Sequence, residues 1–460
     1  MPFFRARFVQ LFFLCIVVLL FAGVGCKNNP DSKEALERGV PVTLEYWGVW
    51  NDAGQMKPLV DAYRAIQPNV KIVYRKFRFE EFESKLTEAL AEDRGPDLIS
   101  IHNTWMRRYQ SKLLPMPKTP LRMPRGKTEK KGVATETTYT ITSVPVLSPR
   151  AIKDHFVPPV YTDVVIGNEI YGLPLSVDSL VLFYNRDMLA QAKITKAPST
   201  WQEVLDAART VTQVDKEGKI TRSGVALGTA NNVARYFDIV SLLMLQTGTQ
   251  MTNSDGTKSA FHSAPKAAPD RNPGAEALEF YTNFANPNKE SYAWNASLPD
   301  SSEMFASGQL AMFFGYAYHL PAIKAKNPTL DIGFVPVPQL NPSREVNYAN
   351  YWVETALKKT KYPNEVWDFI QFSTAELQGE KYLEKSGRPP ALRSLVDKLK
   401  EDPDKGVFAL SGLTAESWYH GRNPAAAEEV FKDLISRVLD GKATFQEALT
   451  SAAAQMDQTF

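Results

Sequence analysis

Aromatic and short polar residues stand where the first predicted strand ends and the next helix begins. The strand starts at Val42, and Trp47, Trp50, Asn51 and Asp52 follow at its end. Open α/β sheets tend to bind ligands at this end of their strands, and a helix N-terminus there offers free N–H groups. Flat rings and short polar side chains suit a sugar, which presents apolar C–H faces and a rim of hydroxyls. These residues predict a saccharide-binding surface, with core packing of Trp47 and helix capping by Asp52 as alternatives.

More residues of the same kinds occur along the chain in places that hydrophobic periodicity does not explain. His102 precedes one such group, at the end of a later strand, and others stand in polar loops or beside glycines. The candidate ligand contacts are Asn103, Thr104, Trp105, Asn232, Tyr236, Tyr316, Tyr318, Tyr351, Trp352 and Trp418. Ordinary core or surface packing is the alternative for each residue, and the excess of rings is the collective signal.

Catalytic and metal-binding patterns are missing from the sequence. The five histidines are scattered, without an HExxH motif or a cysteine partner. A glycoside hydrolase needs two carboxylates across a cleft, and no spacing selects a pair from Asp163, Glu169 and Asp178. Nucleophile-elbow, Walker A and dinucleotide-binding motifs are also absent. We therefore predict a protein that is not an enzyme, with no cofactor and no metal, and keep an extracytoplasmic hydrolase as the rival.

Length and charge set broad limits on the class of protein. The chain has 460 residues, enough for about two or three compact units. Its 53 basic and 51 acidic side chains nearly cancel, so charge does not indicate a nucleic-acid partner.

The N-terminus has the pattern of an export signal. Arg5 and Arg7 precede an apolar run, 8–24, that ends in Gly25-Cys26. Residues 21–26 resemble a bacterial lipobox, which predicts lipidation of Cys26, with an uncleaved membrane helix as the alternative. The polar segment 27–38 reads as a tether. We therefore expect residues 1–26 to form the signal or anchor, and the domain to stand on the extracytoplasmic side of the membrane.

Alternating helical and strand periodicities predict an α/β fold. A strand from Val42, a helix with apolar residues at helical spacing over 56–66 and an Asp52–Gln55 capping pair at its start, and a strand over 70–74 should form a right-handed βαβ unit with parallel strands. Thr200 and Glu203 predict a capping box at the start of another helix. Later helices are expected around 278–284, 366–370, 430–438 and 445–456, and a strand over 332–337. Segment 115–150 has little periodicity and reads as an extended surface insertion without assigned function.

Several short segments, in the right order, resemble the family 1 extracellular solute-binding proteins of ABC transporters, the maltose-binding-protein-like family. They are Gly95-Pro96-Asp97-Leu98, residues 170–179 (IYGLPLSVDS), residues 182–187 (LFYNRD), Pro198-Ser199-Thr200-Trp201, the spacing of Phe305, Gly308, Ala311-Met312 and Gly315, and residues 333–338 (GFVPVP). The resemblance implies a two-lobed periplasmic-binding-protein-like fold (class II type), with a hinge between lobes and ligand in the inter-lobe cleft. Lobe 1 should contain 39–175 plus 337–387, and lobe 2 should contain 176–336 plus 388–460.

The resemblance also assigns roles to single residues. Asp178 matches an acidic ligand-binding position of the family, where a carboxylate can accept hydrogen bonds from two hydroxyls. Asn103 to Trp105 fall where members commonly touch ligand, and Tyr316 and Tyr318 stand where relatives often place a stacking tryptophan.

The implied function is capture of a small-molecule ligand, a sugar or oligosaccharide, for delivery to the membrane permease by a monomeric protein. A ligand-sensing receptor with the same fold is the alternative. A phosphorylated ligand would need an arginine cluster near the cleft. The arginines available for it, which the sequence leaves scattered, are Arg107, Arg108, Arg235 and Arg388.

Overall fold

The first lobe is built on a five-stranded sheet. The structure is a computed structural model that describes residues 39–131 and 134–460. The strand order is β2-β1-β3-β16-β4, with β1 (Val42–Gly48), β2 (Val70–Lys76), β3 (Leu98–His102), β16 (Trp352–Leu357) and β4 (Leu113–Leu114). β1 runs parallel to β2 and β3, whereas β16 runs antiparallel to β3 and β4. The predicted strand–helix–strand order with parallel strands is confirmed, because α3 (Ala53–Ile66) connects β1 to the parallel β2 and begins with the Asp52–Gln55 capping box.

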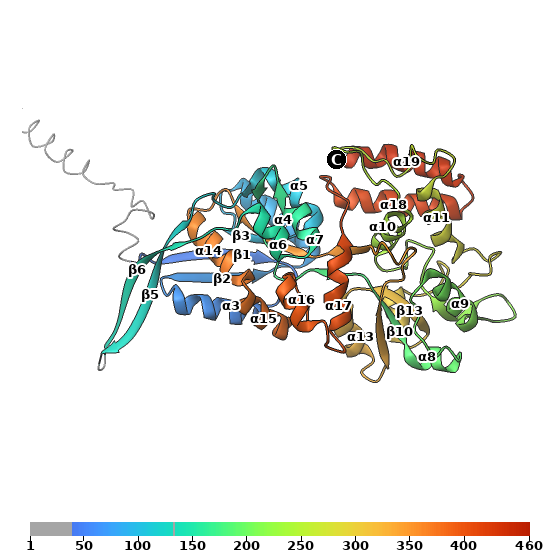
Figure 1. The fold of residues 1–460 in the computed structure, drawn as a ribbon, viewed down its shortest axis with the longest axis horizontal. Coiled ribbons are helices and arrows are strands. Elements are labelled where there is room, and N and C mark those ends of the chain that lie inside the picture. The colour runs from blue at the N-terminus through green and yellow to red at the C-terminus, as the bar shows by residue number, and fades with distance from the viewer. Residues whose placement is uncertain (1–38, 132–133) are drawn as a thin grey trace, which may run out of the picture.

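Helices cover this sheet and close its core (Figure 1). They are α4 (Phe79–Ala91), α5 (Met106–Tyr109), α6 (Pro149–His155), α7 (Pro158–Val164), α14 (Pro363–Thr374), α15 (Glu376–Ser386) and α16 (Arg393–Leu399). Their apolar faces join the strands in one cluster of buried side chains, which includes Leu59, Phe82, Ile101, Trp367 and Phe369.

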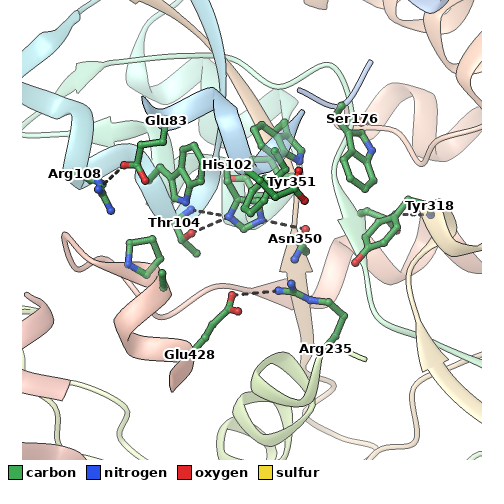
Figure 2. A pocket seen from close by; sticks show the side chains of 18 of the residues that line it. Glu83, His102, Thr104, Arg108, Ser176, Arg235, Tyr318, Asn350, Tyr351 and Glu428 are labelled. Atoms are coloured by element: carbon green, nitrogen blue, oxygen red, sulfur yellow. Dashed lines mark hydrogen bonds and ion pairs between the residues drawn. The ribbon is translucent and has the colours of Figure 1, made fainter. Parts of the chain in front are cut away.

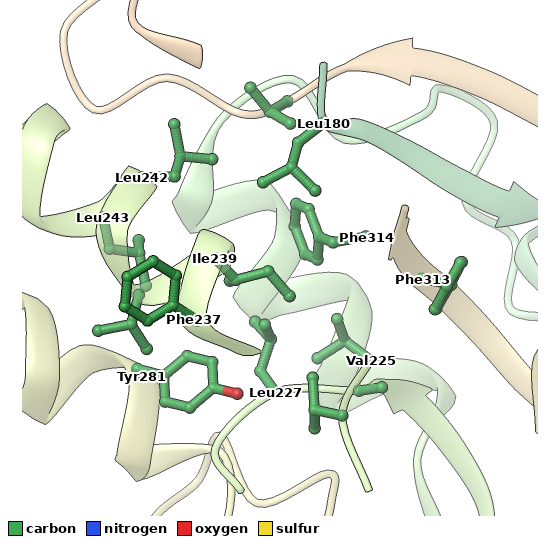
Figure 3. Close-up of a cluster of buried hydrophobic side chains, with 14 of the residues drawn as sticks. Leu180, Val225, Leu227, Phe237, Ile239, Leu242, Leu243, Tyr281, Phe313 and Phe314 are labelled. Atoms are coloured by element: carbon green, nitrogen blue, oxygen red, sulfur yellow. The ribbon is translucent and has the colours of Figure 1, made fainter. Parts of the chain in front are cut away.

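The second lobe has its own five-stranded sheet and its own core. The strand order is β11-β12-β13-β10-β14, with β11 (Gln213–Val214), β12 (Ile220–Val225), β13 (Leu310–Gly315), β10 (Val181–Asn185) and β14 (Ile332–Pro336). Its helices are α8 (Arg186–Gln191), α9 (Trp201–Val211), α10 (Tyr236–Thr247), α11 (Pro273–Asn283), α12 (Ser301–Ala306), α13 (Leu320–Lys326), α18 (Pro424–Leu439) and α19 (Phe445–Met456). The predicted Thr200–Glu203 capping box opens α9, and Figure 3 shows aromatic and aliphatic side chains of α10 and β13 meeting in this core.

Three short strands lie where the chain passes from one core to the other. β9 (Asp178–Ser179), β15 (Asn347–Asn350) and β17 (Ala415–Glu416) form one small sheet in the order β17-β15-β9. Val177 and Ala349 pack in the first core, whereas Leu180 and Tyr348 pack in the second. α17 (Gly406–Ser411) runs between the lobes in Figure 1.

The predicted lobe boundaries stay a prediction. The two cores divide the chain at somewhat different residues. Val337 and Val346 pack in the second core, whereas Leu395 and Val396 pack in the first. The strands at which the chain changes core are therefore the natural place to look for a hinge.

Segment 115–150 is more regular than the sequence indicates. β5 (Leu121–Lys131) and β6 (Ala134–Val144) pair antiparallel in continuous register and project from the end of the first lobe (Figure 1). Many side chains of the hairpin are exposed on both faces, so the alternation of apolar and polar residues that marks a half-buried strand does not develop. The other short elements are β7 (Val165–Ile166), β8 (Glu169–Ile170) and the 3₁₀ turns at 103–105, 110–112, 317–319, 412–414 and 457–459.

The predicted N-terminal features lie outside the described residues. These are the signal or anchor segment 1–26 with Cys26, and the tether 27–38. Within 39–131 and 134–460, none of the helices is long and apolar enough to cross a membrane.

An ion pair between half-buried Arg125 and buried Asp368 fastens the hairpin to the first lobe, and its loss should destabilise the protein. Arg125 donates two hydrogen bonds of 2.7 Å to the carboxylate of Asp368, whose side chain is 2% exposed. Arg125→Met removes the cation and should lower the free energy of unfolding by about 2–4 kcal/mol, measured by urea unfolding. Arg122→Met, at an exposed position of the same strand, is the control and should change it by less than about 0.5 kcal/mol. Equal effects of the two substitutions would contradict the role of the ion pair.

Candidate functional site

A cleft with a volume of about 440 Å³ is lined by residues of both lobes and of the crossing strands (Figure 2). Ligand pockets typically measure about 300–1,000 Å³, so the cleft can hold a small molecule. Its lining residues are Trp50, Phe79, Glu80, Glu83, His102, Thr104, Trp105, Arg108, Ser176, Asp178, Arg235, Tyr318, Asn350, Tyr351, Trp352, Arg388, Pro424, Ala425 and Glu428.

Aromatic rings form one wall of the cleft. Trp50 and Trp352 lie nearly parallel, with ring centroids 6.4 Å apart and an interplanar angle of 11°. Trp352 also meets Trp105 edge-on at 5.9 Å, and Phe79 contacts both rings. Tyr318 of the second lobe meets Trp50 edge-on at 4.9 Å. Ring faces and edges from both lobes therefore border the same space.

Asp178 lies at the crossing strand β9 and holds the start of the turn that carries Tyr318. Its carboxylate accepts hydrogen bonds from the backbone N–H groups of Ser179 at 3.0 Å, Ala317 at 3.2 Å and Tyr318 at 3.3 Å. Burial raises the pKa of the Asp178 carboxyl to about 7, against the lowering effect of these N–H groups and of Arg388. Asp178 can therefore donate or accept a hydrogen bond near neutral pH, depending on its protonation.

A chain of hydrogen bonds connects the two lobes beneath the cleft. His102 Nε2 lies 3.1 Å from Asn350 Oδ1, and its Nδ1 lies 2.8 Å from the Thr104 hydroxyl. The amide oxygen can only accept, so Nε2 carries the proton and Nδ1 accepts from Thr104. Burial, together with the charge of Arg235, lowers the pKa of His102 to about 4. The imidazole is therefore neutral at physiological pH and fixed in one tautomer.

The same chain ends at the buried carboxylate of Asp238 in the second lobe. Asp238 accepts from Asn350 Nδ2 at 3.3 Å, from the Tyr316 hydroxyl at 2.7 Å, and from Arg235 Nε and Nη2 at 2.8 and 2.9 Å. Arg235 adopts a left-handed backbone conformation (φ 60°) directly before α10, and Figure 2 shows its side chain turned toward Glu428. Asp238 therefore orients an arginine, an amide and a hydroxyl at once.

A second buried carboxylate, that of Asp163 on α7, fixes groups behind the cleft. It accepts from Tyr351 at 2.6 Å, Asn103 at 3.0 Å, Ser417 at 2.5 Å and His420 at 2.9 Å. Burial alone would raise the pKa of the Asp163 carboxyl, but these hydrogen bonds, that of His420 foremost, lower it below its ordinary value. Asp163 is therefore a charged anchor for the back wall of the cleft.

The structure brings seven of the fifteen predicted contacts together. They are Trp50, Thr104, Trp105, Asp178, Tyr318, Tyr351 and Trp352.

The other eight predicted contacts lie elsewhere. Three of them lie near the start of α3: Trp47 packs against Phe77, Asn51 accepts a hydrogen bond from Tyr382, and Asp52 caps the helix. Three donate hydrogen bonds to other side chains, namely Asn103 to Asp163, Tyr316 to Asp238 and Trp418 to Ser241. The last two donate to backbone carbonyls, Asn232 to those of Asn295 and Leu298 and Tyr236 to that of Glu428. None of these eight lines the cleft.

Several cleft residues were not among the predicted contacts. Three of the four scattered arginines, Arg108, Arg235 and Arg388, line the cleft, and Arg107 does not. His102 and Asn350 stood beside predicted residues in the sequence, so their position after a strand or in an aromatic cluster was a usable signal. Glu80, Glu83 and Glu428 lie on surface helices, where an acidic residue carries no distinguishing pattern.

In the part of the chain that the structure describes, no group of three or more histidine, cysteine, aspartate or glutamate side chains could hold a metal ion. The chemistry that the cleft offers is ring stacking and hydrogen bonding.

Two α/β lobes with separate cores, joined at three strands and enclosing an aromatic and polar cleft, define a two-lobed ligand-binding protein. The sequence matches the family described as bacterial extracellular solute-binding protein over residues 48–378. This chain belongs to that family, whose members are binding proteins.

Individual relatives agree with this assignment. The diacetylchitobiose binding protein DasA of Streptomyces coelicolor is 23% identical over 334 residues, which cover 70% of this chain and 67% of that protein. Two solved structures share the fold over 91% of this chain. The cyclic alpha-maltosyl-1,6-maltose binding protein of Arthrobacter globiformis has a TM-score of 0.71 at 16% identity and is covered over 99% of its length. The sugar-binding protein MalE of Xanthomonas citri has a TM-score of 0.70 at 17% identity and is covered over 97%.

The raised pKa of Asp178 predicts a dependence of stability on pH. Between about pH 4 and pH 7 the folded protein holds a proton on Asp178 that the unfolded chain has released, so this contribution to stability is lost as the pH rises through about 7. Asp178→Asn cannot ionise, and its stability relative to the wild type should increase by at least about 1 kcal/mol from pH 4 to pH 8, measured by urea unfolding. A difference that stays constant with pH would show that Asp178 is ionised throughout.

Proposed function

We propose that this protein is the extracytoplasmic saccharide-binding component of an ABC importer. The observation that carries the proposal is that Trp50 and Trp352 from one lobe and Tyr318 from the other border one cleft, beside the hydrogen-bonding groups of Thr104, Asp178 and Asn350. Rings stack on the C–H faces of a sugar and polar groups bind its hydroxyls. The names of the relatives support a sugar or oligosaccharide, since they bind diacetylchitobiose and a cyclic maltosyl-maltose.

The mode of binding that we propose is closure of the lobes around the ligand. Both lobes supply rings and polar groups to the cleft, so a ligand that touches both favours the closed arrangement through its differential affinity for it. The three strands β9, β15 and β17 serve as the hinge, and the closed form delivers the ligand to a membrane permease.

The location and assembly that we propose follow from the sequence. Export by the N-terminal signal and lipidation of Cys26 anchor the protein at the outer face of the membrane, with 27–38 as the tether and the protein acting as a monomer.

Catalysis is not part of the proposal. Of the three acids that the sequence analysis nominated for a hydrolase, Asp163, Glu169 and Asp178, only Asp178 lines the cleft. Asp163 lies behind the cleft, where its carboxylate already accepts several hydrogen bonds. Glu169 lies in β8, where it forms an ion pair with Lys118 and accepts a hydrogen bond from Tyr171. A general acid and a second carboxylate across the cleft are therefore not supplied by these residues.

A thermal-shift screen of the full-length protein in mild detergent tests this proposal. A neutral or charged saccharide at 100 times its dissociation constant should add about 2.7 kcal/mol to the stability of the folded form. Trp352→Leu should weaken binding of that saccharide roughly tenfold or more, because it removes a stacking face.

Tyr184→Leu is the matched control for this substitution. Tyr184 is a half-buried aromatic residue of β10 that does not line the cleft, so its replacement should leave affinity unchanged. The proposal fails if no saccharide stabilises the protein, or if the two variants bind it equally well.

A further inference from the structure

The three arginines at the cleft differ in how their positive charge is balanced. Arg108 forms an ion pair with Glu83 on α4. Arg235 forms two hydrogen bonds with Asp238, and Glu428 lies 3.9 Å from its Nη2. Figure 2 shows Arg108 beside Glu83 and Arg235 turned toward Glu428. The charges of these two arginines are therefore already neutralised by the protein.

Arg388 lacks such a partner. It follows α15, is half-buried and lines the cleft, with its guanidinium carbon 5.2 Å from the ring centroid of Trp50. Within 39–131 and 134–460, no ion pair joins it to a carboxylate, and no side-chain hydrogen bond fixes its guanidinium. A guanidinium stacked on an aromatic ring still has N–H groups at its edge to donate.

The charge of Arg388 acts on two buried carboxyls, those of Asp178 and Glu354. Burial raises the pKa of each to about 7, although the charge of Arg388 lowers it. Asp178 already accepts three backbone N–H groups, and Glu354 accepts from Ser100 and Tyr46. Neither carboxyl is free to form a close pair with the guanidinium.

We infer that the ligand is an acidic saccharide whose carboxylate, that of a uronic acid unit, pairs with Arg388 while its ring stacks on the neighbouring tryptophans. This inference rests on the proposed function and narrows its ligand class. A planar carboxylate matches the donor fork of a guanidinium in two parallel hydrogen bonds.

The balance of charge at the cleft favours one carboxylate over a phosphate. Among the described residues that line the cleft, Arg388 is the one cation without an ion-pair partner, and the carboxylate of Glu80 lines the same space. A phosphate group near neutral pH carries up to two negative charges, and its second charge would face Glu80 without a cation to balance it.

The test is isothermal titration of the full-length protein with matched neutral and acidic sugars. The probes are glucose, mannose and galactose disaccharides, their glucuronate, mannuronate and galacturonate counterparts, the free uronates, and glucose 6-phosphate. At least one uronate disaccharide should bind ten times or more tighter than its neutral counterpart. Arg388→Gln should weaken the binding of that uronate disaccharide at least tenfold more than the binding of its neutral counterpart, which removes this preference. Arg344→Gln, at an exposed position outside the cleft, is the control and should keep the preference.

Each outcome separates this inference from the proposed function. Binding of neutral disaccharides with no preference for uronates would overturn the inference and leave the proposed function standing. The inference also fails if Arg388→Gln weakens neutral and acidic sugars equally, or if glucose 6-phosphate binds tighter than every uronate. Absence of binding by all of these sugars overturns the inference, and the proposed function falls with it only if no saccharide of the thermal-shift screen binds either. A preference for free uronates over disaccharides supports the inference and restricts it to monosaccharides.

Discussion

The passage of the chain between two separate hydrophobic cores at three short strands is the constraint on which the rest of the structure depends. β15 pairs with both β9 and β17, and at each of these strands the chain leaves one core and enters the other. Asp178 and Asn350 stand on these strands and line the cleft. The site is therefore built partly from the connection itself, and a change in the angle between the lobes must alter its geometry.

Two buried carboxylates hold the polar groups of the site in place. A buried charge is costly without partners, and Asp163 and Asp238 each accept several hydrogen bonds. Asp238 connects the second lobe through Asn350 to His102 of the first, and Asp163 joins Tyr351 to the segment that contains Ser417 and His420. The donors around the cleft are thus oriented before a ligand arrives, which reduces the entropy that binding must overcome.

The sequence predicted the fold better than the site, for physical reasons. The first βαβ unit and the helix at 201–211 carry clear periodicity and capping boxes, and both are as expected. The hairpin at 121–144 was missed because exposed strands leave no apolar alternation. Their position after a strand predicted that Trp50 and Thr104 lie near a ligand site, and both line the cleft. The same rule predicted a contact for Trp47, which instead packs against Phe77. Arg235 and Arg388 reach the cleft from distant helix ends, a proximity that only the tertiary fold creates.

The central claim, that a saccharide binds between the two lobes, is tested most directly by a crystal structure of the complex. The ligand to use is the saccharide that stabilises the protein most. The account predicts electron density for it between Trp50, Trp352 and Tyr318, with hydrogen bonds from both lobes. Density at another site, such as the groove beside Arg125 and Phe372 at the base of the hairpin, would contradict the claim.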